Sequence, residues 1–188
     1  MSEAAVRIDP ARLAKVKTLK SGGHAQTQRQ MCVMEAVAYV AGEPWSDHPE
    51  CTCPVITAFM MAWNDGLPTD ADRNRLLLPL IPKLVGTRGS PALANRRATM
   101  AADWFIRVQT PAWLRLAGLT AHADLLAGMP EITDFANVPS LRPALEAART
   151  DADAAGAAAR DALKPTTESL QASAVELIER MCALTEAA

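Results

Sequence analysis

The sequence predicts an all-α protein, an irregular orthogonal bundle of several helices that ends in an antiparallel helical hairpin. Hydrophobic residues make up 49% of the 188 residues, whereas aromatic residues make up only 4%. This balance is typical of closely packed helices, because strands favour β-branched and aromatic residues. Apolar residues recur at helical spacing in most segments, and no segment has the alternating pattern of a half-buried strand.

Residues 1–23 are predicted to form an N-terminal arm with a short helix that begins near Pro10. The arm lacks the apolar core of a secretion signal, and no run of about 18 apolar residues is long enough to span a membrane. We therefore expect a cytoplasmic protein that does not insert into a membrane. Its four cysteines are then expected to be reduced thiols or ligands rather than disulfides.

Residues 24–139 are predicted to form the helical core. A helix is expected over 27–41, where Gly42 is well placed to end it. The proline-rich segment 43–53 is expected to be a loop, and a second helix should run from Pro54 to about residue 64.

The middle of the core is punctuated by proline. The apolar segment 71–86 is expected to be a buried helix that Pro79 and Pro82 kink or divide. Further helices are expected over 89–109, with Ser90 as the cap, and over 110–119. Two short helices should follow around 122–129 and 131–137. The tryptophans that recur at helical spacing are expected in the core: Trp63, Trp104 and Trp113.

Residues 140–188 are predicted to form the C-terminal hairpin. The segment 140–164 is rich in alanine, and the segment 165–187 places Leu170, Leu177 and Met181 on one face. Two helices joined near residue 165 follow from this pattern. We expect this hairpin to self-associate or to bind a protein partner.

One polar strip on the predicted helix 27–41 is the best candidate for a site. Gln28, Cys32, Glu35 and Tyr39 fall within about 60° of one another on a helical wheel, and the rest of the helix is almost entirely apolar. A buried carboxyl group there needs a partner, because an unpaired one is costly. We expect a polar pocket between this helix and the loop 43–53, lined by Gln28, Tyr39, Trp45 and Asp47.

Three hypotheses explain the strip. In the first, it is a structural network in which an arginine or loop amides bind Glu35 and Cys32 acts as a small hydrophobic residue. In the second, a subset of nearby residues binds zinc or iron, although their spacing matches no standard zinc finger. The candidate metal ligands are His24, Cys32, Glu35, His48, Cys51 and Cys53.

The third hypothesis is a cysteine nucleophile. Cys32 is expected in an early turn of one helix, and Cys53 directly precedes Pro54 at the start of another. The N-terminus of a helix favours the thiolate, and a nearby histidine would favour it further. The sequence does not determine which histidine, His24 or His48, would approach either thiol.

The charge distribution suggests a basic surface in the middle of the chain. From Arg73 to Arg115 there are eight basic residues and one acidic residue, Asp103. The candidate surface residues are Arg73, Arg75, Arg88, Arg96 and Arg97. The formal net charge of −2, sparse aromatic residues and the lack of a recognition-helix pattern make a nucleic acid an unlikely partner.

The runs "MCVMEAVAYVAGEPWSDHPECTCPVITAF", "LLLPLIPKLVGTRG" and "RRATMAADWFIRVQTPAWLRLAGL" resemble a family of uncharacterised helical proteins from actinobacteria and their phages. The resemblance covers about residues 24–119 and implies no activity. The leading hypothesis is a non-enzymatic helical binding or interaction protein. The alternatives are a metalloprotein or metal-dependent enzyme and, third, a cysteine enzyme.

Overall fold

The computed structural model describes residues 7–28, 30–135, 139, 142–155 and 163–185, and no strand occurs among these residues. The all-α prediction is confirmed. By its internal packing the chain divides into two compact units. Unit 1 comprises residues 1–94 and 178–188, and unit 2 comprises residues 95–177. These boundaries fall inside helices, at positions other than the predicted divisions after residues 23 and 139.

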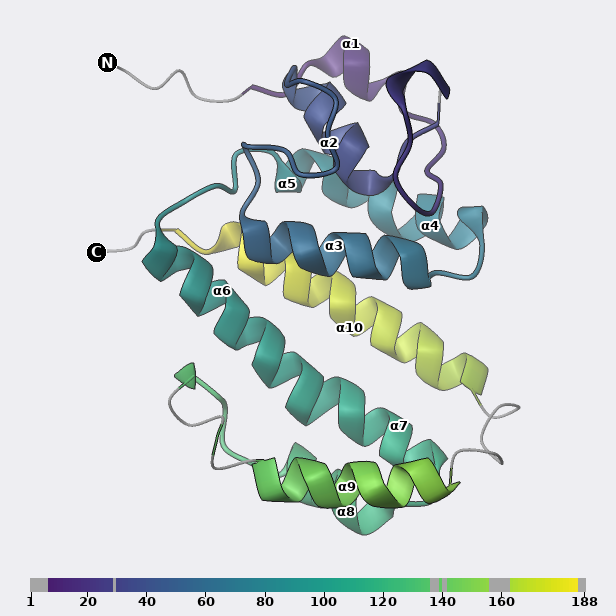
Figure 1. Ribbon diagram of the computed structural model, residues 1–188, viewed down its shortest axis with the longest axis vertical. Helices are drawn as coiled ribbons and strands as arrows, with labels where there is room; N and C mark the ends of the chain where they lie inside the picture. The colour runs from purple at the N-terminus through teal and green to yellow at the C-terminus, as the bar shows by residue number, and fades with distance from the viewer. Residues whose placement is uncertain (1–6, 29, 136–138, 140–141, 156–162, 186–188) are drawn as a thin grey trace. The chain divides into compact units, whose positions relative to one another are not determined.

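Unit 1 contains the short helices of the N-terminal half (Figure 1). Helix α2 is buried nearly all round and packs against α3 and α5, so it forms the centre of this unit. The short helix expected near Pro10 is present as α1. The elements are α1 (Pro10–Leu13), the 3₁₀ turn η1 (Gln26–Gln28), α2 (Val33–Ala41), α3 (Pro54–Gly66), α4 (Asp70–Leu77), η2 (Leu78–Leu80) and α5 (Ile81–Leu84).

Helix α2 begins later than the predicted residue 27. Cys32 is its N-cap residue, and Glu35 completes a capping box by accepting a hydrogen bond from the Cys32 backbone N–H. This reciprocal pair sets the first turn at Val33, so residues 26–28 form a separate 3₁₀ turn. The predicted end is confirmed, since Gly42 adopts the left-handed conformation with φ of 79°.

The prolines divide the segment after α3 as predicted. Pro79 lies in η2 and Pro82 in α5, and each lacks the N–H that would continue the preceding α-helix. The resulting short helices still bury their apolar side chains, including Leu77, Leu80 and Ile81. Helix α3 begins at Pro54, as expected.

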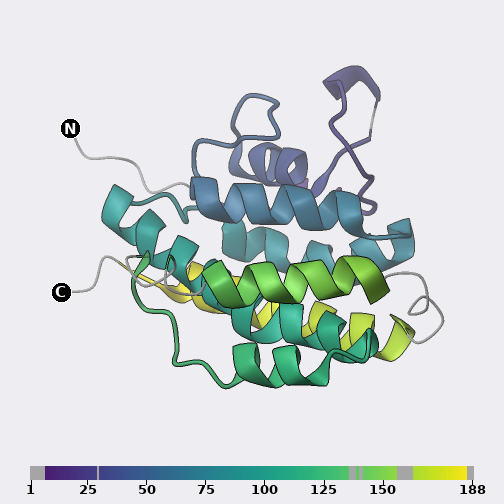
Figure 2. The same cartoon turned by 60° about the horizontal axis from the view of Figure 1, so that its bottom comes forward.

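Unit 2 is built around one long helical run, which Figure 1 shows as α6 continuing into α7. Ser90 caps α6, as predicted, by accepting the Leu93 N–H at 3.1 Å. Helix α8 packs on α7, and α9 packs on α8 (Figure 2). The elements are α6 (Pro91–Trp104, in this unit from residue 95), the π-helical segment η3 (Phe105–Gln109), α7 (Thr110–Leu116), α8 (Thr120–Ala127), α9 (Arg142–Ala155) and most of α10 (Leu163–Ala183).

The segment η3 is a consequence of Pro111. This proline has no N–H to donate to the carbonyl group four residues earlier, so a regular α-helix is not sustained through it. The neighbouring Thr110 N–H instead bonds the Phe105 carbonyl five residues back. A π-type turn therefore joins α6 to α7 without breaking the run. The helix expected from residue 110 is present, but it continues this run and does not start a new direction.

The helix expected over 131–137 is absent from its described part. Ile132 is buried in the core of unit 2 with Ile106, Leu114 and Leu126, and its N–H bonds Asp103 Oδ1 at 2.9 Å. That bond satisfies the backbone without a helical turn, so residues 131–134 are irregular. Residues 136 and 137 lie outside the described ranges.

The two predicted C-terminal helices are present as α9 and α10. The described apolar side chains of α9, such as Ala148, join the core made by η3, α7 and α8. The apolar face of α10 is also covered, since Leu170, Leu177 and Met181 are buried. Within the described ranges, no helix combines the length and apolar character that a membrane span requires.

Candidate functional site

Glu35 is the centre of the predicted polar pocket in unit 1. Its side chain lies on α2 and is almost completely buried, with 2% of the residue exposed. Oε1 accepts the backbone N–H of His24 at 2.5 Å, and Oε2 accepts the backbone N–H of Cys32 at 2.7 Å. Backbone amides therefore satisfy both carboxylate oxygens of Glu35. The structural-network hypothesis assigns this role to loop amides.

The His24 ring completes the arrangement. Its Nδ1 atom lies 3.1 Å from Glu35 Oε2, and the side chain is 9% exposed. The His24 carbonyl accepts the indole N–H of Trp45 at 2.7 Å. His24, Cys32, Glu35 and Trp45, here named the Glu35 cluster, thus connect the segment before α2, the start of α2 and the loop 43–53.

Asp47 lies at the edge of this cluster. A Cβ atom at Gly23 would lie 3.7 Å from Asp47 Oδ2 and 3.9 Å from Glu35 Oε1, so both carboxyl groups border this glycine. Asp47 Oδ1 is 2.7 Å from Nδ1 of His48, whose side chain is 68% exposed. Asp47 therefore positions a histidine that is mostly in solvent.

The other two predicted pocket residues are placed differently. The Tyr39 carbonyl accepts a hydrogen bond from Arg12 Nη1 at 2.9 Å, and the Arg12 guanidinium lies 5.4 Å from the Tyr39 ring centre. Tyr39 thus fastens α1 to α2. The side chain of Gln28 lies outside the described part of the chain.

The six candidate metal ligands do not come together as one group. His24 and Cys32 each bond Glu35, whereas His48 bonds Asp47. The backbone N–H of Cys53 donates to Thr87 Oγ1 at 3.2 Å, and the Cys51 carbonyl accepts the Arg88 N–H at 2.9 Å. Across the described ranges, no three or more His, Cys, Asp or Glu side chains are grouped so that they could hold a metal ion.

The surroundings of Cys32 and Cys51 disfavour ionisation of their thiols. Burial raises the pKa of Cys32 to about 12, and the nearby Glu35 carboxyl group acts in the same direction. Burial also raises the pKa of Cys51. Since the thiolate is the nucleophilic form, neither residue has the lowered pKa that the cysteine-enzyme hypothesis requires.

We expect a corresponding pattern of alkylation. Iodoacetamide at pH 8 should modify Cys182, which is partly exposed, well before Cys32, Cys51 and Cys53, which are buried. The three buried thiols should react only when the chain unfolds in urea. Mass spectrometry of tryptic peptides over time checks this order, and rapid labelling of Cys32 in the folded protein would contradict the burial argument.

The predicted basic surface is wrong at two of its five positions. Arg73 is 4% exposed and Arg97 is 2% exposed, so neither side chain can contribute to a surface. Arg75, Arg88 and Arg96 are exposed, and Arg75 pairs with Asp72 at 2.9 Å. The sequence alone could not separate the buried arginines from the exposed ones, because the burial of a side chain depends on which other helices pack against it.

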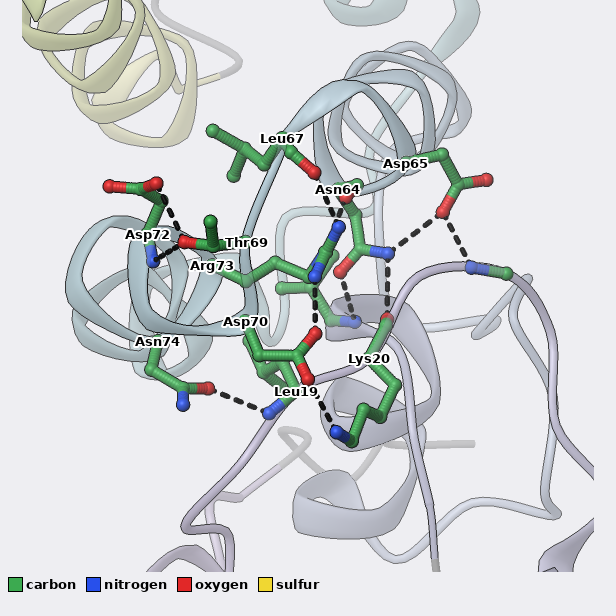
Figure 3. A network of polar contacts seen from close by, with 12 residues as sticks. Leu19, Lys20, Asn64, Asp65, Leu67, Thr69, Asp70, Asp72, Arg73 and Asn74 are labelled. Carbon is green, nitrogen blue, oxygen red and sulfur yellow. Dashed lines mark hydrogen bonds and ion pairs between the residues drawn. The ribbon is translucent and has the colours of Figure 1, made fainter.

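Arg73 belongs instead to a polar network that holds the end of α3 (Figure 3). Its Nε donates to the Asn64 carbonyl at 2.7 Å and its Nη2 to the Leu67 carbonyl at 2.5 Å. Its Nη1 bonds Asp70 Oδ1 at 2.5 Å. Asp70 also bonds Lys20, whose ammonium group lowers the pKa of this carboxyl. The arginine therefore satisfies carbonyl groups at the C-terminus of a helix.

Asn64 extends the same network to the N-terminal arm (Figure 3). Its Nδ2 donates to the Lys20 carbonyl at 2.9 Å, and its Oδ1 accepts the Val33 N–H at 3.3 Å. Asn74 Oδ1 accepts the Leu19 N–H at 2.7 Å. These bonds fasten residues 19–20 to α3 and α4, which places the neighbouring Gly23 and His24 against α2. The network is structural.

A second candidate site is an exposed apolar face on unit 2, which the sequence interpretation missed. Phe105, Val108 and Trp113, here named the apolar face, are 43%, 40% and 38% exposed. Trp113 was expected in the core, and its position is a correction. Among the described residues, all of the exposed large hydrophobic side chains lie between residues 105 and 135. The Thr110-Pro111 step inside a helical pattern was the sequence signal for this irregularity.

Comparison with family models, curated proteins and solved structures found no match for this chain. The resemblance to a helical family of actinobacteria and their phages stays a prediction.

Proposed function

We propose that the chain is a non-enzymatic helical interaction protein, which acts by binding an uncharged, apolar helix face of a protein partner through its own apolar face. The supporting observation is the exposure of Phe105, Val108 and Trp113 on one helical run, whereas no large apolar side chain among the described residues of unit 1 is exposed to the same degree. Aromatic side chains contribute strongly to protein interfaces because they bury a large area.

The side chains near the apolar face indicate the chemistry of the partner. The residues at helical spacing from the face include the uncharged Gln109, Ala112 and Leu116 and also Arg115, whose charge is paired with Asp124 at 2.9 Å. A charged partner surface would lose hydration here without gaining an opposite charge. An apolar helix would lose little and bury apolar area.

Other surfaces support binding less well. On the described part of α10, Leu170, Leu177 and Met181 are buried, so this apolar face supports self-association less well than an exposed one. The basic surface loses Arg73 and Arg97 to the interior. The Glu35 cluster satisfies its own polar groups, which supports a structural role for it.

Site-specific photocrosslinking tests this function. A benzophenone amino acid at Val108 should crosslink a protein in cells, and a Val108→Glu variant should no longer co-purify with that protein. The control carries the same photocrosslinker at Ala58, which is exposed on α3 in unit 1. Equal crosslinking from positions 108 and 58, or unchanged co-purification of Val108→Glu, would overturn the proposal.

A further inference from the structure

Residues 21–28, here named the polar loop, leave the body of unit 1 and return to it at one place. The backbone N–H of Lys20, just before the loop, donates to the Met31 carbonyl at 2.9 Å. The buried Asn64 holds the same place, because its Nδ2 donates to the Lys20 carbonyl at 2.9 Å and its Oδ1 accepts the Val33 N–H at 3.3 Å (Figure 3). Both ends of the loop are thus fixed to α3, as in an Ω-loop.

The polar loop contributes little apolar burial of its own. Within residues 21–27, every residue except His24 is exposed. A Cβ atom added at Gly22 would meet nothing within 4 Å. The flanking residues differ, since Leu19 and Val33 are fully buried. Opening the loop therefore removes little apolar area of its residues from contact, whereas opening its ends would remove much more.

Polar bonds at His24 hold the middle of the loop. The His24 N–H donates to Glu35 Oε1 at 2.5 Å, and the His24 ring Nδ1 lies 3.1 Å from Glu35 Oε2. The indole N–H of Trp45 donates to the His24 carbonyl at 2.7 Å. These groups can bond water when the loop moves away, so breaking the bonds costs less than unfolding a helix whose apolar side chains are buried.

We propose that the polar loop is a latch, whose middle detaches from Glu35 and Trp45 and returns as one unit while its ends and the rest of unit 1 stay folded. In the open state Glu35 Oε2 still accepts the Cys32 N–H, so α2 keeps its capping box. Glu35 Oε1 and the Trp45 N–H then become available to water or to another molecule. The latch belongs to unit 1 and does not involve the apolar face.

Hydrogen exchange of the full chain, followed by NMR at several urea concentrations below the unfolding transition, tests the latch. We expect the His24 amide to exchange at least about a hundredfold faster than the amide of Val37, which lies within α2. The rate at His24 should hardly depend on urea, because opening exposes little surface, whereas the rate at Val37 should rise steeply.

Two results would overturn the latch. The first is the same rate and the same urea dependence at His24 and Val37, since the loop would then open only when the unit unfolds. The second is a His24 amide that exchanges as fast as one in an unstructured peptide, since the loop would then not close.

A variant tests the bond from Trp45 to the latch. Trp45→Phe removes the donor to the His24 carbonyl but keeps an aromatic ring, so exchange at His24 should become about three- to tenfold faster while exchange at Val37 is unchanged. Ser46→Ala is the matched control in the same loop, because Ser46 Oγ accepts the His48 N–H at 3.0 Å, and it should leave both rates as in the parent. Equal acceleration at His24 and Val37 in Trp45→Phe, or none at His24, would contradict the latch.

Discussion

Replacing Glu35 with alanine is expected to lower the free energy of unfolding by about 3–5 kcal/mol. The substitution leaves the backbone N–H groups of His24 and Cys32 without their acceptor, and it removes the partner of the His24 ring. The Cys32 N–H is buried and the His24 N–H is partly buried, so hydration recovers little of the loss. Urea unfolding followed by far-UV circular dichroism measures the change.

Two further variants define the cause of this loss. Glu35→Gln keeps one carbonyl oxygen but presents an NH₂ group to the other N–H donor, so an intermediate loss of about 1–3 kcal/mol is expected. Glu50→Ala, at an exposed position in the same unit, should change stability by less than about 0.5 kcal/mol. A Glu35→Ala protein as stable as Glu50→Ala would show that the Glu35 cluster does not hold the segment before α2.

Replacing Arg73 with methionine is the second large expected effect, a loss of about 3–5 kcal/mol. Methionine keeps much of the side-chain volume but leaves the buried carbonyl groups of Asn64 and Leu67 without donors. It also removes one of the two cationic partners of Asp70, which keeps Lys20. Because domains are stable by only about 5–15 kcal/mol, this variant should approach the unfolded state at room temperature.

Arg75 provides a matched control two residues away. Its side chain is 59% exposed and pairs with Asp72 on the surface, so Arg75→Met should cost no more than about 1 kcal/mol. Arg73→Lys should be intermediate, since one ammonium group cannot reproduce the forked geometry of guanidinium. Equal midpoints of chemical unfolding for the two methionine variants would mean that Arg73 is an ordinary surface arginine.

The local elements were predictable where a single residue determines them. Gly42 ends α2 because it adopts a left-handed conformation at little cost. Pro54 and Ser90 mark helix starts, and Pro79 and Pro82 divide an apolar segment. These effects depend on the backbone chemistry of one residue and its near neighbours, which the sequence contains in full.

The candidate sites were only partly predictable for a different reason. The helical wheel grouped Cys32 with Glu35 correctly. His24 also bonds Glu35, through its backbone N–H and its ring. It does so from a loop and not from an extension of the helix. The cysteines at 51 and 53 contact residues 87 and 88 instead. Loop contacts depend on distant partners, and no local periodicity encodes them.

The sequence by itself determined the helical class, the capping residues and the interruption of helices by proline, because each follows from local backbone preference and hydrophobic spacing. The tertiary structure alone decided that Arg73 and Arg97 are buried and that Trp113 is exposed. The burial of a side chain depends on which helices pack against it. That packing minimises exposed apolar area and unpaired polar groups over the whole chain, so it is not a property of any one segment.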